Sequence, residues 1–187
     1  MSRVATCALA GLALALAALV PGSPAGEEGK AVTPFNGTDI YTDEKFGDCV
    51  VELELMIPKG SNSGIYLMGE YEVQVLDSFG KDKVDVHDMG AIYSTAAPKK
   101  NACKKPGEWQ KLVIDFQAPR FADGKKTSNA LFRKVTLNGE VIHEMVEAPK
   151  PTGSELSAKE VATGPLMIQG DHGPVAVRNL KITPQGK

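Results

Sequence analysis

The stretch SNSGIYLMGEYEVQVLD, residues 61–77, decides the fold. It contains two runs that alternate in polarity, Gly64–Met68 and Tyr71–Asp77, joined by the pair Gly69–Glu70. Because glycine readily supplies the positive φ of tight turns, a short glycine-bearing connector between alternating runs predicts a β-hairpin. Side chains alternate between the two faces of a strand, and the apolar set predicts a core face: Ile65, Leu67, Val73 and Val75. We expect the working surface on the opposite face, which carries Tyr66, Met68, Glu72 and Gln74.

The rest of the chain repeats this pattern of short alternating runs separated by turn residues. Asn138-Gly139 lies between two such runs and is the preferred sequence of a type I′ hairpin turn. A short helical turn is expected at 157–161, and further strands at 46–57, 90–94, 109–116, 132–146, 165–169 and 175–182. About eight or nine short strands without crossover helices favour an all-β antiparallel sandwich or barrel.

The first 25 residues have the pattern of a secretory signal peptide. Arg3 precedes the small-apolar run Ala8–Val20, and Ser23-Pro24-Ala25 places small residues at a cleavage site. The run is too short and too rich in alanine for a convincing membrane span. We therefore expect a single mature domain, residues 26–187, that is periplasmic or secreted and has no membrane anchor.

The charge of the chain argues against one class of partner. The formal net charge is −2, and no cluster of lysine and arginine stands out. Nucleic acid is therefore not an expected partner. The sequence leaves the oligomeric state open.

Two cysteines, Cys49 and Cys103, remain after the leader. Export would permit a disulfide between them, because disulfides persist in oxidising compartments. Cys49 also falls in the inward register of its strand, which is typical of a small core residue. Spacing alone does not decide between these readings.

An acidic loop offers one candidate metal site, with Asp82, Asp85, His87 and Asp88 close together. Carboxylate oxygens are calcium ligands, but the spacing matches no EF-hand. A solvated acidic loop is the interpretation that we favour, and the requirement for a divalent metal stays open.

Three histidines are present. His143 lies in a hairpin strand and is expected on the surface. His172 belongs to Gln169-Gly-Asp-His-Gly-Pro, a glycine-bounded loop between two strands, where functional side chains are common. A turn-stabilising role for His172 fits the sequence equally well.

Ordinary paired-carboxylate glycoside hydrolysis is not favoured by the outward register of residues 72–76. That register supplies Glu72, Gln74 and Leu76, with Asp77 out of register. Hydrolysis of that kind needs two facing carboxyl groups. A single acid/base residue, assisted by amide, histidine or arginine groups, remains compatible with the sequence.

Three further side chains could contact a sugar or serve the fold. Tyr66 and Trp109 offer aromatic faces that suit the C–H surface of a pyranose, although a structural role for Trp109 fits as well. Arg178 lies among apolar neighbours in the last strand, where arginine either pairs with a carboxylate or binds a ligand.

Five segments in this order resemble the 3-keto-disaccharide hydrolase domain family (DUF1080): NSGIYLMGEYEVQVLDS, GAIYS, PGEW, LNGEVIHE and PLMIQGDHGPVAVRNLKI. The resemblance covers residues 46–183. It implies a concanavalin A-like β-sandwich (jelly roll) in exported bacterial proteins. It also implies action on 3-keto-glycosides, by hydrolysis or by elimination followed by hydration.

The resemblance also implies a site. A ketone at C3 acidifies the proton at C2, so the chemistry needs one base and donors for an enolate oxygen, with a divalent metal left open. We hypothesise that Glu72 or His172 is the base, and that Arg178 and Gln74 hold sugar or enolate oxygens. Further substrate-binding candidates are Tyr66, Asp77, Trp109 and Gln169.

The sequence departs from the family pattern at two places. Met68 stands where family members commonly have arginine. Members also carry a tryptophan-containing stretch before their first matching strand, whereas here Phe35-Asn36-Gly37 runs almost directly into Phe46-Gly47-Asp48. We therefore expect one or two early strands to be missing or supplied differently.

Whether the protein is an enzyme stays open. It could cleave a 3-keto-glycoside, act as a non-catalytic carbohydrate-binding module of the same fold, or be a cell-surface interaction domain with a vestigial groove. Met68 favours the last two, whereas Glu72, Gln74, His172 and Arg178 together favour the enzyme. The enzyme reading requires the strand that bears Glu72 to share one basin with His172 and Arg178.

Overall fold

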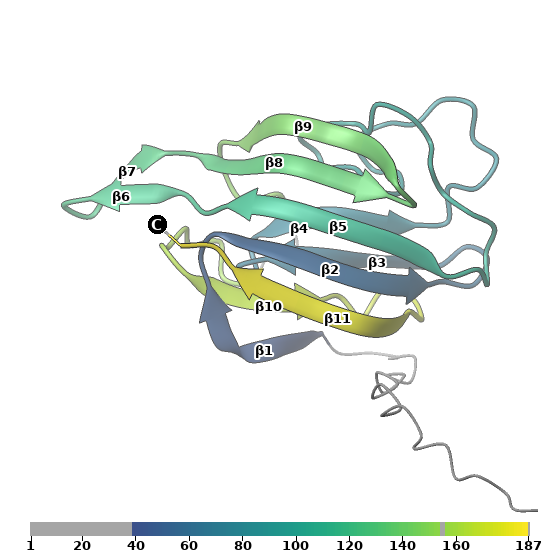
Figure 1. Cartoon of the computed structure of the whole chain (residues 1–187), viewed down its shortest axis with the longest axis horizontal. Helices are drawn as coiled ribbons and strands as arrows, with labels where there is room; N and C mark the ends of the chain where they lie inside the picture. Colours follow the sequence, from purple (N-terminus) through teal and green to yellow (C-terminus); the bar gives the residue numbers. More distant parts are fainter. Residues whose placement is uncertain (1–38, 154–155, 187) are drawn as a thin grey trace, which may run out of the picture.

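The computed structural model describes residues 39–153 and 156–186, so the predicted signal peptide lies outside the described residues. In the described part the only regular elements are strands, in two facing antiparallel sheets and one separate two-stranded hairpin (Figure 1). This confirms the all-β antiparallel sandwich expected from the sequence. No helix in this part is long and apolar enough to cross a membrane.

The smaller sheet has four strands and lies behind the larger sheet in Figure 1. Its order is β1 (Ile40–Phe46), β10 (Gly164–Ile168), β3 (Asn62–Leu67) and β4 (Tyr71–Leu76). The hairpin β3–β4 is the one expected around residues 61–77. Pairing of Tyr66 with Glu72 and of Gly64 with Gln74 sets its register.

The larger sheet has five strands, in the order β11 (Ala176–Pro184), β2 (Cys49–Met56), β5 (Gln110–Gln117), β8 (Ala130–Leu137) and β9 (Glu140–Ala148). A separate hairpin of β6 (Arg120–Ala122) and β7 (Lys125–Ser128) projects beyond the sandwich (Figure 1). The core lies between the two sheets. As expected from the alternation, it includes Ile65, Leu67, Val73 and Val75, all at most 2% exposed.

Local sequence predicts the position of one hairpin turn correctly and places the other turn one residue too late. Asn138 and Gly139 have φ values of 54° and 85°, so the expected Asn-Gly turn forms. In the β3–β4 hairpin, positive φ falls on Met68 (59°) and Gly69 (71°), one residue earlier than expected. The positive φ takes Met68 out of the strand alternation, and its side chain packs into the core at 4% exposure. Met68 is therefore not part of the outer face, contrary to the prediction.

The early strands differ from the expectation as well. Strand β1 forms directly before β2 and pairs with β10, so one early strand is present that the sequence did not suggest. The strand expected at 90–94 does not form as a regular element: Ile92 makes isolated bridges to Val73 and to Ala96, and residues 90–93 form backbone hydrogen bonds along the outer edge of β4. The helical turn expected at 157–161 is absent, because these described residues form an irregular loop with Ala158 at a φ of 57°.

Both cysteines of the described chain are free thiols, so the disulfide reading is wrong. Cys49 is buried at the start of β2, where it pairs with Phe116. Cys103 accepts a hydrogen bond from Gln110, which pairs with Leu55 near the other end of β2. Six strand residues span about 20 Å, so the two thiols cannot meet.

His143 is buried at 2% exposure, which corrects its expected surface position. The cause is a bulge in β9: Val135 pairs with His143, but the next residue, Thr136, pairs with Val141. A bulge adds one residue to a strand and breaks the alternation of faces. The imidazole Nε2–H consequently points inward and donates to the Gly90 carbonyl oxygen at 2.8 Å.

Asp88 departs from the expected solvated loop, because it is 1% exposed. Its carboxylate accepts hydrogen bonds from the ammonium of Lys81 (2.5 Å), the hydroxyl of Ser78 (3.0 Å) and the backbone N–H of Asp85 (2.9 Å). This carboxylate therefore organises the 78–88 loop.

Candidate active site

The outer face of the four-stranded sheet carries a row of large side chains that runs across the strands. Met167 of β10 pairs with Tyr66 of β3, and Tyr66 pairs with Glu72 of β4. The row continues into Tyr93, whose backbone N–H donates to the Glu72 carbonyl oxygen at 3.2 Å. Adjacent strands lie about 5 Å apart, so these side chains are direct neighbours.

A second row, one step along the strands, places Gly64 between two amides. Gly64 pairs with Gln74, and its carbonyl oxygen accepts the backbone N–H of Gln169 at 2.9 Å. The missing side chain makes room on the sheet. A Cβ at position 64 would lie 2.3 Å from Oε1 of Glu72 and 2.7 Å from Cε2 of Tyr66. The Glu72 carboxyl therefore lies over the backbone of β3, in space that only glycine leaves free.

Burial of the Glu72 side chain raises the pKa of its carboxyl into the range of a general base at neutral pH. Glu72 is 2% exposed. Burial raises the pKa of Glu72 from 4.5 to about 7, against smaller lowering effects of the Tyr66 hydroxyl and of the charge on His172. A carboxyl with a pKa near the working pH can accept a proton and release it again.

Tyr66 supplies a protonated hydroxyl beside this carboxyl. Burial raises the pKa of Tyr66, and the neighbouring charge of Glu72 raises it further, so the phenol keeps its proton. The hydroxyl is close enough to influence Glu72 electrostatically. It does not, however, reach the geometry of a full hydrogen bond with any described residue. A buried donor without a partner is costly, and it is therefore a group that a ligand would satisfy.

His172 approaches from the loop between β10 and β11. Its side chain is 45% exposed, and its Nδ1–H donates to the carboxylate of Asp171. This pairing leaves Nε2 for a substrate. The loop is fixed at both ends: Gly170 N–H donates to Asp39 Oδ1 at 3.0 Å, and the Ser61 hydroxyl donates to the Pro174 carbonyl oxygen at 2.6 Å.

The structure therefore brings together five of the residues proposed from the sequence: Tyr66, Glu72, Gln74, Gln169 and His172. The two glutamines are both nearly buried. The Oε1 of Gln74 accepts the backbone N–H of Val75 at 3.0 Å, which leaves the amide nitrogen for other partners.

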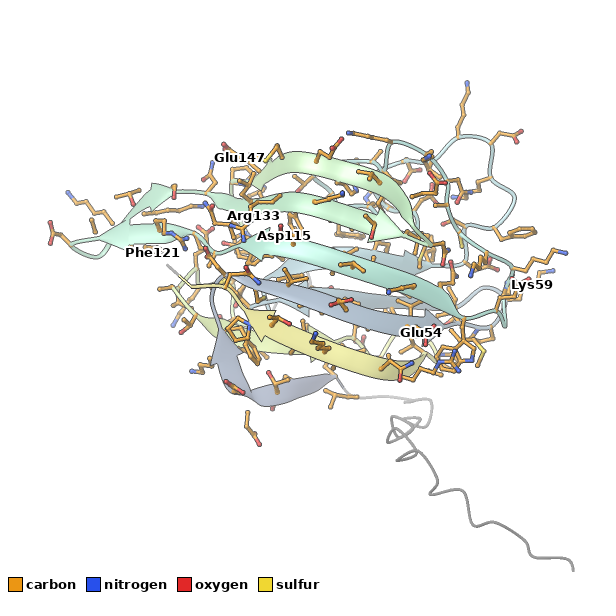
Figure 2. All side chains as sticks on the ribbon, in the orientation of Figure 1. Glu54, Lys59, Asp115, Phe121, Arg133 and Glu147 are labelled. Atoms are coloured by element: carbon orange, nitrogen blue, oxygen red, sulfur yellow. The ribbon has the colours of Figure 1, made fainter. Side chains whose placement is uncertain are left out.

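Arg178 and Trp109 are not part of this group. Arg178 pairs with Glu54 across β11 and β2 in the larger sheet, and its Nε donates to the Glu54 carboxylate at 2.8 Å. Its guanidinium carbon also lies 4.0 Å from the ring centroid of Trp109. Glu54 lies on the outer face of the five-stranded sheet, the face turned to the viewer in Figure 2. The expected common basin for His172 and Arg178 is therefore wrong.

Asp77 stabilises the turns on either side of the β3–β4 hairpin. Its carboxylate accepts the backbone N–H of Gly60 at 2.9 Å and that of Phe79 at 3.4 Å. Both bonds hold the chain where β4 ends, away from the row that contains Glu72. The structure consequently gives Asp77 a role in the fold.

Two residues of the site were missed. Tyr93 belongs to the segment GAIYS, but its place opposite Glu72 depends on the pairing of that segment with β4. Asn62 precedes Gly64 by two positions on the same face of β3, and its buried Oδ1 accepts no hydrogen bond from the described residues. Extending the strand alternation by two residues would have identified Asn62.

The described residues contain no group of three or more histidine, cysteine, aspartate or glutamate side chains arranged to hold a metal ion. The acidic loop considered from the sequence uses Asp88 for internal hydrogen bonds instead.

The 3-keto-alpha-glucoside-1,2-lyase-like domain family matches residues 20–183. The chain belongs to this family. Membership explains the ordered set of segments on which the sequence resemblance depends. No curated protein matches the chain in sequence.

Solved structures support the family and the fold. A provisionally assigned glycosyl hydrolase from Parabacteroides distasonis is 31% identical to this family member, with a TM-score of 0.71 and coverage of 79% of this chain and 68% of the other. A second such protein from the same organism is 22% identical, with a TM-score of 0.59 and coverage of 79% and 83%. The carbohydrate-binding module CBM66 from Bacillus subtilis shares the fold at 11% identity, with a TM-score of 0.51 and coverage of 83% and 91%.

Proposed function

We propose that this domain cleaves 3-keto-glycosides by elimination, with Glu72 as the base. The observation that carries the proposal is the Glu72 carboxyl, which is buried on the outer face of the smaller sheet and has a pKa of about 7. Membership in the 3-keto-alpha-glucoside-1,2-lyase-like family supports the choice of substrate. A single carboxylate suffices for this chemistry, so the missing second carboxylate is accounted for.

The reaction begins at C2 of the keto sugar. Glu72 removes the C2 proton, and the electron pair of the broken C–H bond moves toward the C3 ketone as an enolate. The pair then returns to form the C1=C2 bond while the bond from C1 to the glycosidic oxygen breaks. The proton that Glu72 has accepted passes to the departing oxygen, directly or through water, which restores the carboxylate. The product is an unsaturated 3-keto sugar, to which water can add in a separate step.

Neighbouring donors stabilise the charge that develops in this reaction. The Tyr66 hydroxyl keeps its proton and lies beside Glu72, so it is placed to donate to the enolate oxygen. His172, whose Nδ1–H donates to Asp171, presents Nε2 as an acceptor for a sugar hydroxyl. Gln74 and Gln169 flank Gly64 and bind sugar hydroxyls in this proposal.

Substrate access requires a movement, because Glu72 and Tyr66 are only 2% and 0% exposed. The segment that we expect to move is residues 171–173, the part of the β10–β11 loop between its two anchored ends, since it carries the exposed His172. We also place the reaction outside the cytoplasm, in the periplasm or the medium, because residues 1–25 have the pattern of a signal peptide.

The test is incubation of purified protein with 3-keto-glucosides, with and without chelator, while release of the leaving group is followed. Glu72→Gln is expected to lower kcat by about 10²–10⁴-fold, as loss of a general base does, and His172→Ala to lower it as well. Wild-type activity that both variants retain would remove the site assignment. Saturable sugar binding without release would instead identify a carbohydrate-binding module.

A further inference from the structure

A serine, a histidine and an aspartate lie together on the loop between β4 and β5, and the proposed elimination uses none of them. The Ser94 hydroxyl lies 3.4 Å from Nε2 of His87, and Nδ1 of His87 lies 3.5 Å from Oδ1 of Asp85. This is the sequence of contacts in a catalytic triad: a nucleophile, its base and the carboxylate that orients the base. Such contacts are often long before a substrate binds, and they shorten in the complex.

Contacts within the loop hold the three residues in this arrangement. Oδ1 of Asp85 also accepts the backbone N–H of His87 at 2.8 Å, and the Ser94 N–H donates to the Val86 carbonyl oxygen at 3.0 Å. The imidazole packs edge-on against the Tyr93 ring, with centroids 5.0 Å apart and ring planes at 72°. The imidazole is therefore oriented toward the serine, although the His87 side chain is 55% exposed.

The backbone at Ser94 has an unusual conformation. Its φ of 51° lies in the left-handed region, which residues other than glycine adopt uncommonly. Strain of this kind concentrates at functional sites, and the nucleophilic serine of many hydrolases is held in a strained turn. The turn leaves Ser94 exposed, so a substrate can reach its hydroxyl without the movement that the buried Glu72 requires.

A hollow of about 470 Å³ begins at Ser94 and can receive a ligand. Its volume lies within the range of ordinary ligand pockets. The apolar side chains of its lining are the small residues Pro151 and Ala158. Such a lining suits a short acyl chain and offers little apolar surface to a long one.

The same hollow supplies donors for an oxyanion. The backbone N–H groups of residues 94–96 already donate to carbonyl oxygens of the same loop. Thr95 and Lys150 also line the hollow and are exposed, with a hydroxyl and an ammonium as free-standing donors. Donors placed near the carbonyl oxygen stabilise the charge that develops during acyl transfer.

We propose that Ser94, His87 and Asp85 form a second active site, which hydrolyses esters of short carboxylic acids. The Ser94 oxygen bonds to the ester carbonyl carbon while its proton passes to Nε2 of His87. The bond from that carbon to the alcohol oxygen then breaks, and the alcohol takes the proton from His87. Water attacks the acyl-serine in the same way, which releases the carboxylic acid and restores the serine.

In this site Asp85 is a positioning residue. It faces Nδ1–H of His87, which leaves Nε2 unprotonated and turned to the serine. Because the three residues take no part in the chemistry at Glu72, the proposal does not depend on the proposed function.

Two reagents test the site: p-nitrophenyl acetate as the ester, and phenylmethylsulfonyl fluoride, which transfers its sulfonyl group to an activated serine oxygen and releases fluoride. Wild type should hydrolyse the ester with saturation and carry the label at Ser94, located by mass spectrometry of peptides. Ser94→Ala and His87→Ala should each abolish the label and lower kcat/KM by about 10²-fold or more, as loss of a nucleophile or its base does. The matched control is Ser128→Ala, an exposed serine in β7, which should change neither.

Asp85→Asn tests the positioning role, because the amide oxygen can still accept the His87 backbone N–H. We expect kcat for the ester to fall while KM stays within about 2-fold. An unchanged kcat in this variant would remove Asp85 from the site. Hydrolysis that Ser94→Ala retains, a label on another residue, or a wild type that is neither labelled nor active would overturn the proposal. Since neither reagent is a 3-keto-glycoside, each of these results is independent of activity at Glu72.

Discussion

The Glu72 carboxyl occupies the space in which a side chain at Gly64 would begin, with Oε1 only 2.3 Å from the position of a Cβ. The two residues pair diagonally across β3 and β4, because Gly64 lies opposite Gln74 and Tyr66 lies opposite Glu72. The absence of one methyl group thus determines where the carboxyl rests and how well it is shielded from water.

Gly64→Ala should therefore impair catalysis by displacing Glu72. The new methyl would meet both the Glu72 carboxyl and the edge of the Tyr66 ring at 2.7 Å, so one of them must move. We expect kcat to fall by about 10-fold or more and the pH at half-maximal rate to shift downward, because a displaced carboxyl is better hydrated. A pH–rate profile measures both. The control is Gly60→Ala, where no atom lies within 4 Å of the new Cβ and only positive-φ strain is added.

The pKa of Glu72 predicts a specific pH dependence of stability. Because the pKa of the folded state, about 7, is above the ordinary value of 4.5, the folded protein binds this proton more tightly than the unfolded chain. The resulting stabilisation is complete below pH 4.5 and is lost as the pH rises through 7. Urea unfolding at pH 5 and at pH 8 should show this loss, amounting to about 3 kcal/mol. In Glu72→Gln this contribution to the pH dependence should disappear, and an unchanged difference between the two pH values would contradict the assignment.

Asn62→Leu should separate stability from function. The buried Oδ1 of Asn62 has no hydrogen-bond partner among the described residues, and an unpaired buried acceptor costs about 1–3 kcal/mol. We expect the leucine variant to unfold at equal or higher denaturant concentration than wild type while KM for a 3-keto-glycoside rises. Loss of stability together with unchanged KM would show that the amide serves the fold.

Arg178→Ala should affect the fold and leave the reaction unchanged. The side chain joins Glu54 to Trp109 on the outer face of the larger sheet. A partly exposed ion pair and a cation–π contact together contribute about 1 kcal/mol. Thermal unfolding should detect a loss of that size, with Lys181→Ala on the same strand as the control. A large fall in kcat with an intact fold would return Arg178 to the active site.

Much of the sandwich follows from local patterns in the sequence. Alternation located β2, β3, β4 and β5, and Asn138-Gly139 located the β8–β9 turn, because both signals depend only on neighbouring residues. Strand β1 was missed because its sequence, IYTDEKF, lacks alternation and becomes a strand only by pairing with β10. His143 was misplaced because a bulge depends on the partner strand.

The spatial grouping of the candidate residues could be predicted only in part, for a similar reason. Tyr66, Glu72 and Gln74 share one hairpin face, which the sequence displays directly. His172 and Arg178 are six positions apart, but the chain passes from the smaller sheet to the larger sheet between them. The segment QGDHGP does not show that crossing, so a motif that looks continuous in the sequence is divided between opposite faces of the sandwich.

The bulge in β9 makes the candidate site in the smaller sheet depend on the larger sheet. His143 donates to the Gly90 carbonyl oxygen, and a Cβ on Gly90 would lie 2.4 Å from Cδ1 of Ile142, the neighbouring bulge residue. Gly90 in turn donates to the Gln74 carbonyl oxygen, three residues before Tyr93. The β9 bulge and the segment around Gly90 are therefore constrained to evolve together. Relatives that lack a glycine at position 90 should also have lost the extra residue in β9.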